Sequence, residues 1–425
     1  MHYIRLMRPP SLDAKKNLKI VLTITTDLGD SFLSPDEPVP ISVWLTRWPQ
    51  AGGDVCLTPR SKGRTEVFWR AGMRVLKLEL PVPGKILQGM KKSLSVAAVP
   101  TVHIGASHNL EVDPTAELIP FDKEGRVLAV KAAFPSLADE EPTFEAVREF
   151  ALPSNNLVRV YEAIGESIDR HVWDAGVITM GLLFNMCQEG SPEQKWDKTP
   201  LLEELLCSVT PEKPLNIIEL GCGVGILGLG LASALYRLTF SKWDSEEPSH
   251  SPSNILLTDL EDAEEIAVRN MASERQVRES VDVEKPNVRT EFESLDWEDG
   301  KMGTFGPKAG ARGWDLIIIS DCTYNVDMLS ALVGSISALH KMSMGLGQKD
   351  PKVMLATKPR HSSEKALFGL MEGDGWRILE HAGQPLPVLG MEDESVEIYL
   401  FGKDSKPSRE PQESTSSQPK RRKLR

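Results

Sequence analysis

The pattern of hydrophobic and polar positions divides the chain into a β-rich first third, a longer segment in which apolar strands alternate with helices, and a polar tail. In the first third, runs rich in β-branched residues are separated by clusters of Pro, Gly and Asp, which is typical of strands joined by turns. Strands are predicted there at residues 18–25, 39–48, 66–70, 74–80 and 126–131. We interpret this part as a small β-sandwich or barrel packed on the downstream segment. A module that recruits a partner or substrate is the alternative.

At the start of the downstream segment, the sequence predicts a helix at 141–150, a strand at 157–164 and a helix at 177–187. The helix at 177–187 is apolar nearly all round, so we expect it to be buried. Asp174 would stand at its N-cap.

Beyond this point strands and helices alternate. The predicted strands lie at 215–220, 254–259, 288–292, 314–320 and 352–357, and the helices at 226–238, 261–272, 326–340 and 363–372. Two last strands, at 376–380 and 395–401, have no helix between them and should pair as a hairpin. The predicted fold class is therefore α/β, with a doubly wound seven-stranded sheet that contains one antiparallel strand and is Rossmann-like.

These patterns predict three parts: a β-rich domain at 1–135, an α/β domain at 136–402 and a tail at 403–425. The tail is rich in Ser, Pro and Glu, a composition typical of disorder. Its basic end at 420–425 suggests nuclear import, although a solvated tail without function explains it nearly as well.

Composition narrows the class of protein. Hydrophobic content of 40% and charged content of 26% are ordinary for a globular protein, and the formal net charge of −12 argues against a general nucleic-acid binder. The five cysteines form no C-x-x-C motif, which argues against a zinc site and indicates a reducing compartment. The apolar window at 216–235 contains Glu219 and five glycines, so we predict a buried strand and helix there and no membrane span. We expect a soluble protein of the cytoplasm, the nucleus or both.

The glycine-rich junction at 215–228 organises the α/β segment. An apolar strand runs into Gly221, Gly223 and Gly225 and then directly into an apolar helix. Such a junction brings backbone N–H groups and a helix N-terminus up to a bound ligand, and the absence of Cβ atoms lets a nucleoside lie against the main chain. The residues 223–228 also match G-x-G-x-x-G, the dinucleotide-binding motif. A plain turn between a strand and a helix is the structural alternative.

Candidate site residues follow the other strands at their carboxyl ends, where ligands bind in such sheets. Asp259 ends the second strand and can accept hydrogen bonds from both ribose hydroxyls of a nucleoside. After the third strand, Trp297 offers a stacking face for adenine and Asp296 an acceptor for its exocyclic amine. Asp321 ends the fourth strand. A dinucleotide enzyme has no use for the Asp–Trp pair, and Asp259 lies 34 residues past Gly225 (259 − 225), beyond the roughly 20 residues expected of the dinucleotide motif.

The segment from about 157 to 401 resembles the seven-β-strand (class I) protein-lysine methyltransferases of methyltransferase family 16, which modify translation factors and chaperones. Four motifs carry the resemblance: Val-Trp-Asp-Ala at 172–175, Glu-Leu-Gly-Cys-Gly-Val-Gly at 219–225, Thr-Asp at 258–259 and Asp-Cys-Thr-Tyr at 321–324. Leu-Asp-Trp at 295–297 and Arg-Asn at 269–270 also fit. The β-rich first third departs from the family's shared domain and leaves the substrate open.

The resemblance implies S-adenosyl-L-methionine as the cofactor and a lysine side chain of a protein as the methyl acceptor. The residues expected at the cofactor are Trp173, Glu219, Gly221, Gly223, Asp259, Asp296, Trp297 and Ser320. Asp321 and Tyr324 are expected to face the target nitrogen and to act as the catalytic residues. For Asp321 the alternative is a carboxylate that caps the next helix, and for Tyr324 it is packing at the edge of the sheet.

Three other functions stay open on the sequence. A methyltransferase could act on RNA or on a small molecule, and the net acidity weighs only against RNA. A non-catalytic adaptor could keep the cofactor fold, although the intact set of Asp259, Trp297 and Asp321 argues against such degeneration. A nicotinamide-dependent oxidoreductase ranks last, because no hydride-transfer partner stands at the expected places.

Overall fold

The computed structural model describes residues 1–46, 55–61, 64–84, 101–106, 127–135, 143–152, 156–165, 170–187, 199–210, 212–242, 251–281, 288–348, 350–386, 388–389, 392 and 394–403. The predicted tail, apart from its first residue, therefore lies outside the described residues. No helix in the described ranges is both long and apolar enough to cross a membrane.

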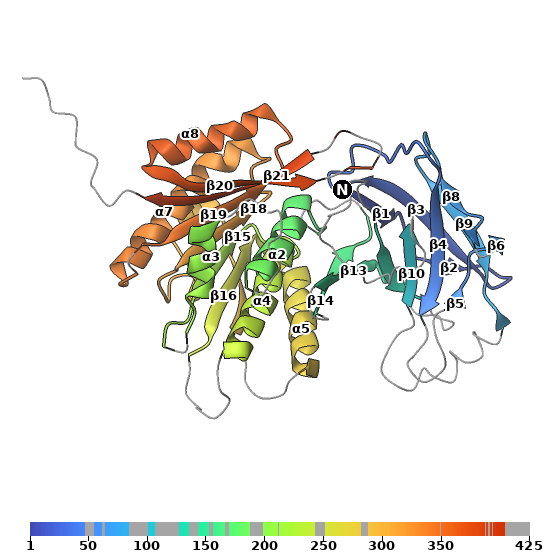
Figure 1. Ribbon diagram of the computed structural model, residues 1–425, viewed down its shortest axis with the longest axis horizontal. Coiled ribbons are helices and arrows are strands. Elements are labelled where there is room, and N and C mark those ends of the chain that lie inside the picture. Colours follow the sequence, from blue (N-terminus) through green and yellow to red (C-terminus); the bar gives the residue numbers. More distant parts are fainter. Residues whose placement is uncertain are drawn as a thin grey trace, which may run out of the picture.

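A seven-stranded sheet forms the centre of the C-terminal part of the chain (Figure 1). Its strands are β15 (Asn216–Leu220), β16 (Ser253–Asp259), β17 (Val288–Ser294), β18 (Leu316–Ser320), β19 (Lys352–Thr357), β20 (Trp376–Leu386) and β21 (Glu394–Lys403). The strand order is β17-β16-β15-β18-β19-β21-β20, with β15 to β19 parallel and β21 antiparallel to both of its neighbours. The predicted doubly wound sheet with one antiparallel strand is confirmed.

Helices cover both faces of this sheet because its strands are apolar on both sides. Leu316 and Ile318 of β18 pack in one core with α2 (Asp174–Met186), α3 (Pro200–Cys207), α4 (Ile226–Lys242) and α5 (Glu264–Val281). Ile317 and Ile319 point into the opposite core with α6 (Trp297–Lys301), α7 (Leu329–Gly345) and α8 (Ala366–Gly373). Short 3₁₀ turns precede three of these helices: η1 (Glu261–Ala263), η2 (Val326–Met328) and η3 (Ser362–Lys365).

The N-terminal part contains two sheets that enclose a common apolar core. The first sheet has the order β11-β1-β3-β2, with β9 paired to β3, and its strands are β1 (His2–Leu6), β2 (Ser11–Leu12), β3 (Asn17–Thr26), β9 (Leu76–Pro81) and β11 (Val127–Leu128). The second has the order β14-β13-β12-β10-β4-β5, with β8 paired to β4. Its strands are β4 (Val39–Thr46), β5 (Val55–Cys56), β8 (Phe68–Trp69), β10 (Thr101–Ala106), β12 (Val130–Ala133), β13 (Glu145–Leu152) and β14 (Asn156–Ala163), and a small ribbon pairs β6 (Arg60–Ser61) with β7 (Arg64–Thr65).

The N-terminal sheets and the α/β part share side-chain packing. Tyr3 of β1 and Val158 and Val160 of β14 belong to the same buried cluster as α2 and α4, and Figure 1 shows β13 and β14 beside α5. Strand pairing continues to Ala163, past the expected boundary at residue 135. We therefore propose that the N-terminal β region, defined here as residues 1–163, ends after β14.

The helix expected at 141–150 is wrong where the chain is described, because residues 145–152 form β13. Burial alternates along this strand, with Ala146, Arg148 and Phe150 on the inner face. Arg148 is a charged residue at an inward position, so the two-residue period is not visible in the sequence. Its side chain is 2% exposed and its Nε lies 2.5 Å from Glu162 Oε2.

Arg148 also donates hydrogen bonds from its two terminal nitrogens to the carbonyl oxygens of Ile4 (3.0 Å) and Ala129 (2.9 Å). Arg148 therefore ties both N-terminal sheets together. Burial acts to raise the pKa of Glu162, but the charge of Arg148 together with the effects of His171 and Arg5 outweighs burial and lowers that pKa to about 2.

Replacing Arg148 by Met should leave Glu162 buried without its closest cation, with only a backbone N–H and more distant partners beside it. We expect the Arg148→Met variant to lose about 3–5 kcal/mol of unfolding free energy at neutral pH, the usual cost of breaking a buried ion pair. Urea unfolding followed by circular dichroism measures this loss. Arg159→Met, which breaks a half-exposed pair with Glu149 on the adjacent strand, is the control and should cost about 1 kcal/mol or less. Equal losses in the two variants would contradict the assigned role of Arg148.

Candidate active site

One pocket lies at the carboxyl ends of β15, β16 and β18, and it brings together all ten residues that the sequence predicts for the site. These are Trp173, Glu219, Gly221, Gly223, Asp259, Asp296, Trp297, Ser320, Asp321 and Tyr324. Their roles toward cofactor and acceptor stay predictions, whereas their convergence is a property of the fold.

The glycine loop between β15 and α4 requires glycine. Gly221, Gly223 and Gly225 have φ angles of 71°, 51° and 80°, in the left-handed region that L side chains rarely adopt. A Cβ on Gly221 would stand 2.5 Å from Cys322 Sγ and 3.2 Å from the indole of Trp297. The loop therefore approaches the end of β18 and the start of α6 more closely than any other residue type allows.

Asp259 links this loop to β16. One carboxylate oxygen accepts a hydrogen bond from the backbone N–H of Gly223 (2.7 Å), and the other accepts from the backbone N–H of Leu260 (2.8 Å). A carboxylate has about four acceptor positions. Asp259 therefore holds the loop with its carboxylate and also lines the pocket.

Asp296 is the N-cap of α6, and its side chain accepts a hydrogen bond from the backbone N–H of Glu298 at 2.9 Å. Trp297 follows directly and begins the helix. Capping therefore fixes the backbone that presents both side chains to the pocket.

Glu219 is a buried carboxyl group beneath the glycine loop, 2% exposed. Burial raises its pKa to about 8, the negative charge of Asp259 adds to this shift, and a hydrogen bond from the Gly228 N–H (3.0 Å) opposes it. At neutral pH most of this group is therefore protonated. It can donate a hydrogen bond, which an ionised carboxylate cannot do.

Ser320 ends β18 with a side-chain oxygen that is buried and has no hydrogen-bond partner among the described residues. Burying a hydroxyl group without a partner is costly. Because Ser320 also lines the pocket, a polar ligand group would relieve this cost.

Asp321 follows Ser320 with a φ of 50° and a side chain that is 2% exposed. Its Oδ1 accepts hydrogen bonds from the backbone N–H of Lys358 (3.1 Å) and from Arg360 (2.8 Å). Its Oδ2 accepts from the backbone N–H of Ala175 (3.0 Å), at the N-terminus of α2, and from Arg360 (3.3 Å). Burial raises the pKa of Asp321, and the guanidinium of Arg360 opposes that shift.

The geometry of Asp321 contradicts the helix-capping alternative, and its role toward a target nitrogen stays untested. The carboxylate meets the N-terminus of α2 and not that of the helix that follows it in the chain. Four protein N–H groups already donate hydrogen bonds to the two carboxylate oxygens of Asp321. These hydrogen bonds compete with any contact between Asp321 and a target nitrogen, which stays a prediction. The side chain fixes the wall of the pocket.

Two aromatic rings flank the pocket beside Asp321. The rings of Trp173 and Tyr324 are nearly parallel, at 6°, with their centroids 6.5 Å apart. The guanidinium carbon of Arg360 stands 5.2 Å from the centroid of the Trp173 ring. Tyr324 is 58% exposed, so this side of the pocket faces solvent.

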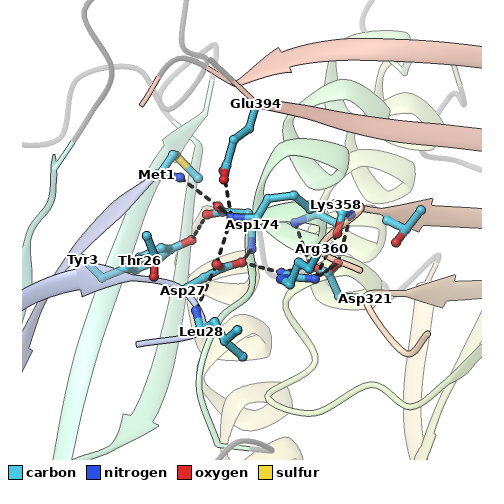
Figure 2. Close-up of polar contacts among 12 residues, drawn as sticks. Met1, Tyr3, Thr26, Asp27, Leu28, Asp174, Asp321, Lys358, Arg360 and Glu394 are labelled. Atoms are coloured by element: carbon cyan, nitrogen blue, oxygen red, sulfur yellow. Dashed lines mark hydrogen bonds and ion pairs between the residues drawn. The ribbon is translucent and has the colours of Figure 1, made fainter. Parts of the chain in front are cut away.

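Three charged residues at this site were missed by the sequence analysis: Asp27, Lys358 and Arg360. Figure 2 shows how they converge with Asp174 and Asp321. Lys-Pro-Arg at 358–360 directly follows β19, whose carboxyl end lies at the site edge, and this position could have marked the two cations. Asp27 follows β3 in the N-terminal region, and nothing in its surroundings points to the pocket.

The expected N-cap role of Asp174 is wrong. Trp173 is the N-cap of α2, and Asp174 is the first residue inside the helix. Its carboxylate accepts hydrogen bonds from Lys358 Nζ (2.8 Å) and from the Tyr3 hydroxyl (2.6 Å). Lys358 and Tyr3, both far from Asp174 in the sequence, engage its carboxylate, so a capping rule based only on neighbouring residues gave the wrong role.

Fold and pocket together define a class of protein, the methyltransferases built on a seven-stranded α/β sheet. The family model of the lysine methyltransferases, methyltransferase family 16, matches residues 153–374, just over half of the chain. The chain belongs to this family and is a methyltransferase.

The chain is also similar to one curated protein and to several solved structures. A protein of the UPF0665 family from Schizosaccharomyces pombe is 24% identical over 381 residues, covering 88% of this chain and 93% of its own. Among solved structures, an O-methyltransferase family protein of Burkholderia thailandensis matches with a TM-score of 0.31 and 10% identity, over 55% of this chain and 59% of its own. An O-methyltransferase of Bacillus cereus in complex with SAH matches with a TM-score of 0.30 and 12% identity, over 53% of this chain and 90% of its own. The family assignment rests on the family model and not on these low scores.

The cofactor is S-adenosyl-L-methionine, as in the family, and the pocket fits it. The glycine loop leaves no room for Cβ atoms, Ser320 has an unpaired buried oxygen, and several carboxyl groups line one pocket, among them Glu219 with its raised pKa. These features suit a ligand with a planar base, a ribose that carries hydroxyl groups and a charged end.

The raised pKa of Glu219 should make the stability of the protein depend on pH. Between the unfolded pKa of 4.5 and the folded pKa of about 8, the folded chain binds this proton more tightly, so the contribution of Glu219 is complete below pH 4.5 and is lost as pH rises through 8. We expect the unfolding free energy of wild type to fall relative to Glu219→Gln over this range, by about 5 kcal/mol at most, at 1.36 kcal/mol per pH unit. Urea unfolding at several pH values measures the difference. The exposed Glu204→Gln is the control, and a pH-independent difference for Glu219→Gln would contradict the assignment.

Asp259→Asn should weaken cofactor binding by about 10- to 100-fold, because hydrogen bonds to a charged acceptor contribute about 1.5–3 kcal/mol. Titration calorimetry with S-adenosylmethionine measures the change. Asp262→Asn removes an exposed carboxylate three residues along the chain and should bind as wild type does. An unchanged dissociation constant for Asp259→Asn would remove this residue from the site.

Proposed function

We propose that the protein transfers the methyl group of S-adenosylmethionine to the side-chain nitrogen of a lysine in a non-histone protein such as a translation factor or chaperone. The convergence of the ten predicted residues in one pocket, open to solvent beside the parallel rings of Trp173 and Tyr324, is the observation that carries this proposal.

The aromatic pair supports a lysine acceptor. Aromatic faces attract ammonium groups, and the apolar stem of a lysine packs well against rings while its nitrogen reaches past them. Tyr324 stands at the exposed end of the pair, where a side chain of a protein substrate can enter. Trp173 is expected from the sequence at the cofactor, but its ring is parallel to that of Tyr324 at the open side of the pocket. We therefore propose that Trp173 and Tyr324 orient the lysine side chain and that the hydroxyl group of Tyr324 accepts a hydrogen bond from its nitrogen.

The residues of the chain supply position and environment. When bound, S-adenosylmethionine supplies a methyl group already activated by a positively charged sulfur. Asp259, Trp297 and Ser320 are proposed to hold the nucleoside end and Glu219 the opposite end, so that the acceptor meets the donor in line. A lysine needs roughly 4–5 kcal/mol to lose its proton at pH 7, and the apolar wall of the pocket lowers this cost by disfavouring the charged form.

Labelling tests the proposal directly. The purified protein is incubated with cell extract and S-adenosylmethionine that carries a labelled methyl group. We expect label in a protein band that resists nuclease and, after digestion and mass spectrometry, methylated lysine in that band. Label that nuclease removes would favour RNA as the acceptor, and label confined to small molecules would favour the other alternative. If the wild-type protein labels nothing, the result favours a non-catalytic adaptor that keeps the cofactor fold.

A further inference from the structure

A buried carboxylate from the N-terminal β region binds Arg360, which in turn binds the pocket residue Asp321. Asp27 is 1% exposed and its Oδ2 lies 2.6 Å from a terminal nitrogen of Arg360. The same guanidinium binds Asp321 at 2.8 Å through its other nitrogen. Figure 2 shows Arg360 between these two acids.

Asp27 makes three further polar contacts. Its Oδ1 accepts hydrogen bonds from Lys358 Nζ (3.0 Å) and from the backbone N–H of Leu28 (2.9 Å), and its Oδ2 accepts from the backbone N–H of Asp174 (3.2 Å). Burial acts to raise its pKa, but the charges of Arg360 and Lys358 hold that pKa well below the usual range. Asp27 is therefore ionised at every physiological pH.

The turn that carries Asp27 is well determined. It starts where β3 ends at Thr26, whose hydroxyl group donates to Asp30 (2.8 Å) and whose backbone N–H donates to Ser31 (3.0 Å). Gly29 occupies the left-handed region with a φ of 79° and donates its N–H to Thr26 (3.1 Å). Asp27 is thus presented from a fixed backbone.

Arg360 connects Asp27 to two residues of the pocket. Its planar fork can bind two carboxylates at once in fixed directions. One side meets Asp27, the other meets Asp321, and the guanidinium lies against the ring of Trp173. A shift of Arg360 would therefore move both a wall residue of the pocket and the ring that we propose to orient the acceptor.

We propose that Asp27 is a positioning residue for methyl transfer, because by sharing Arg360 with Asp321 it fixes Asp321 and Trp173 in the pocket. The N-terminal β region thereby completes the active site of the neighbouring sheet. This inference rests on the proposed function for its acceptor side, and the pocket's cofactor side, at Asp259 and Trp297, is not part of it.

The test compares full-length variants of Asp27. Asp27→Asn keeps the shape of the side chain and removes its charge, Asp27→Glu keeps the charge and moves it by one methylene group, and Asp36→Asn removes an exposed carboxylate of the same region as a control. Three quantities are measured: the dissociation constant of S-adenosylhomocysteine by calorimetry, the unfolding midpoint, and the rate of labelling of the acceptor in extract at saturating S-adenosylmethionine.

We expect Asp27→Asn to bind S-adenosylhomocysteine within about threefold of wild type and to label the acceptor at least tenfold more slowly. Asp27→Glu should recover part of this rate, and Asp36→Asn should equal wild type in all three measurements. If Asp27→Asn does not fold, Asp27→Glu is used in its place, because it retains the charge that pairs with Arg360. This variant should fold and should label the acceptor more slowly than wild type.

A double-variant cycle separates positioning from general destabilisation. Arg360→Lys keeps the positive charge but loses the fork that binds two acids. If Asp27 acts through Arg360, the variant with both changes should be no slower than the slower single variant.

A full labelling rate in Asp27→Asn would overturn the proposal, as would a loss explained entirely by weaker cofactor binding or a lower unfolding midpoint, or effects that multiply in the double variant. Wild type that labels a nucleic acid or a small molecule would overturn only the protein-lysine function, since the Asp27 comparison then runs on that acceptor. Wild type that labels nothing would overturn both.

Discussion

Arg360 allows two carboxylates from distant parts of the chain to be buried close together. An ionised carboxyl group costs several kcal/mol to remove from water, and two near each other also repel. Arg360 binds both Asp27 and Asp321 through its terminal nitrogens, and Lys358 adds a second cation to Asp27. The position of β3 relative to the central sheet, the left-handed backbone at Asp321 and the orientation of Trp173 all depend on this arrangement.

The pocket is chemically divided by these charges. On one side lie the backbone groups of the glycine loop, the Asp296 carboxylate that caps α6 and the buried carboxyl group of Glu219. On the other side, Asp321 and Arg360 form a rigid ionic wall behind an aromatic pair. The two sides meet at Gly221, where a Cβ would collide with Cys322. Close packing at this point explains how residues from four strand ends reach one ligand-sized space.

Much of the fold could be predicted because parallel strands covered on both faces are continuous apolar runs, as Ile317–Ile319 illustrates, and because each such run is followed by a helix with its own period. β13 was mistaken for a helix because Arg148 places a charge on the inner face of a strand. β1 and β10 were missed, and so was α3, a helix of only eight residues.

The site also contains residues that the sequence could predict and residues that it could not. Asp259, Trp297 and Asp321 could be placed because the carboxyl ends of parallel strands must meet at one edge of the sheet. Asp27 could not, because its contact with Arg360 depends on how two separate sheets pack, which no local pattern encodes. Asp321 shows a further limit: the sequence places this residue at the pocket but does not reveal that four protein donors engage its oxygens.

The ionic wall also bears on how an acceptor amine could lose its proton in the proposed reaction. The charge cluster pairs three cations, Arg360, Lys358 and the Met1 amine, with four carboxylates, Asp27, Asp174, Asp321 and Glu394. Its net charge is −1 (+3 − 4), so it attracts an incoming ammonium group despite the guanidinium behind Trp173. Attraction of the charged form opposes deprotonation, and the oxygens of Asp321 are already engaged by the protein. The proton must therefore leave toward solvent, and Tyr324, more than half exposed at the open side of the pocket, stands where that path begins. Desolvation between the two rings, rather than a buried base, then becomes the step that makes the nitrogen reactive.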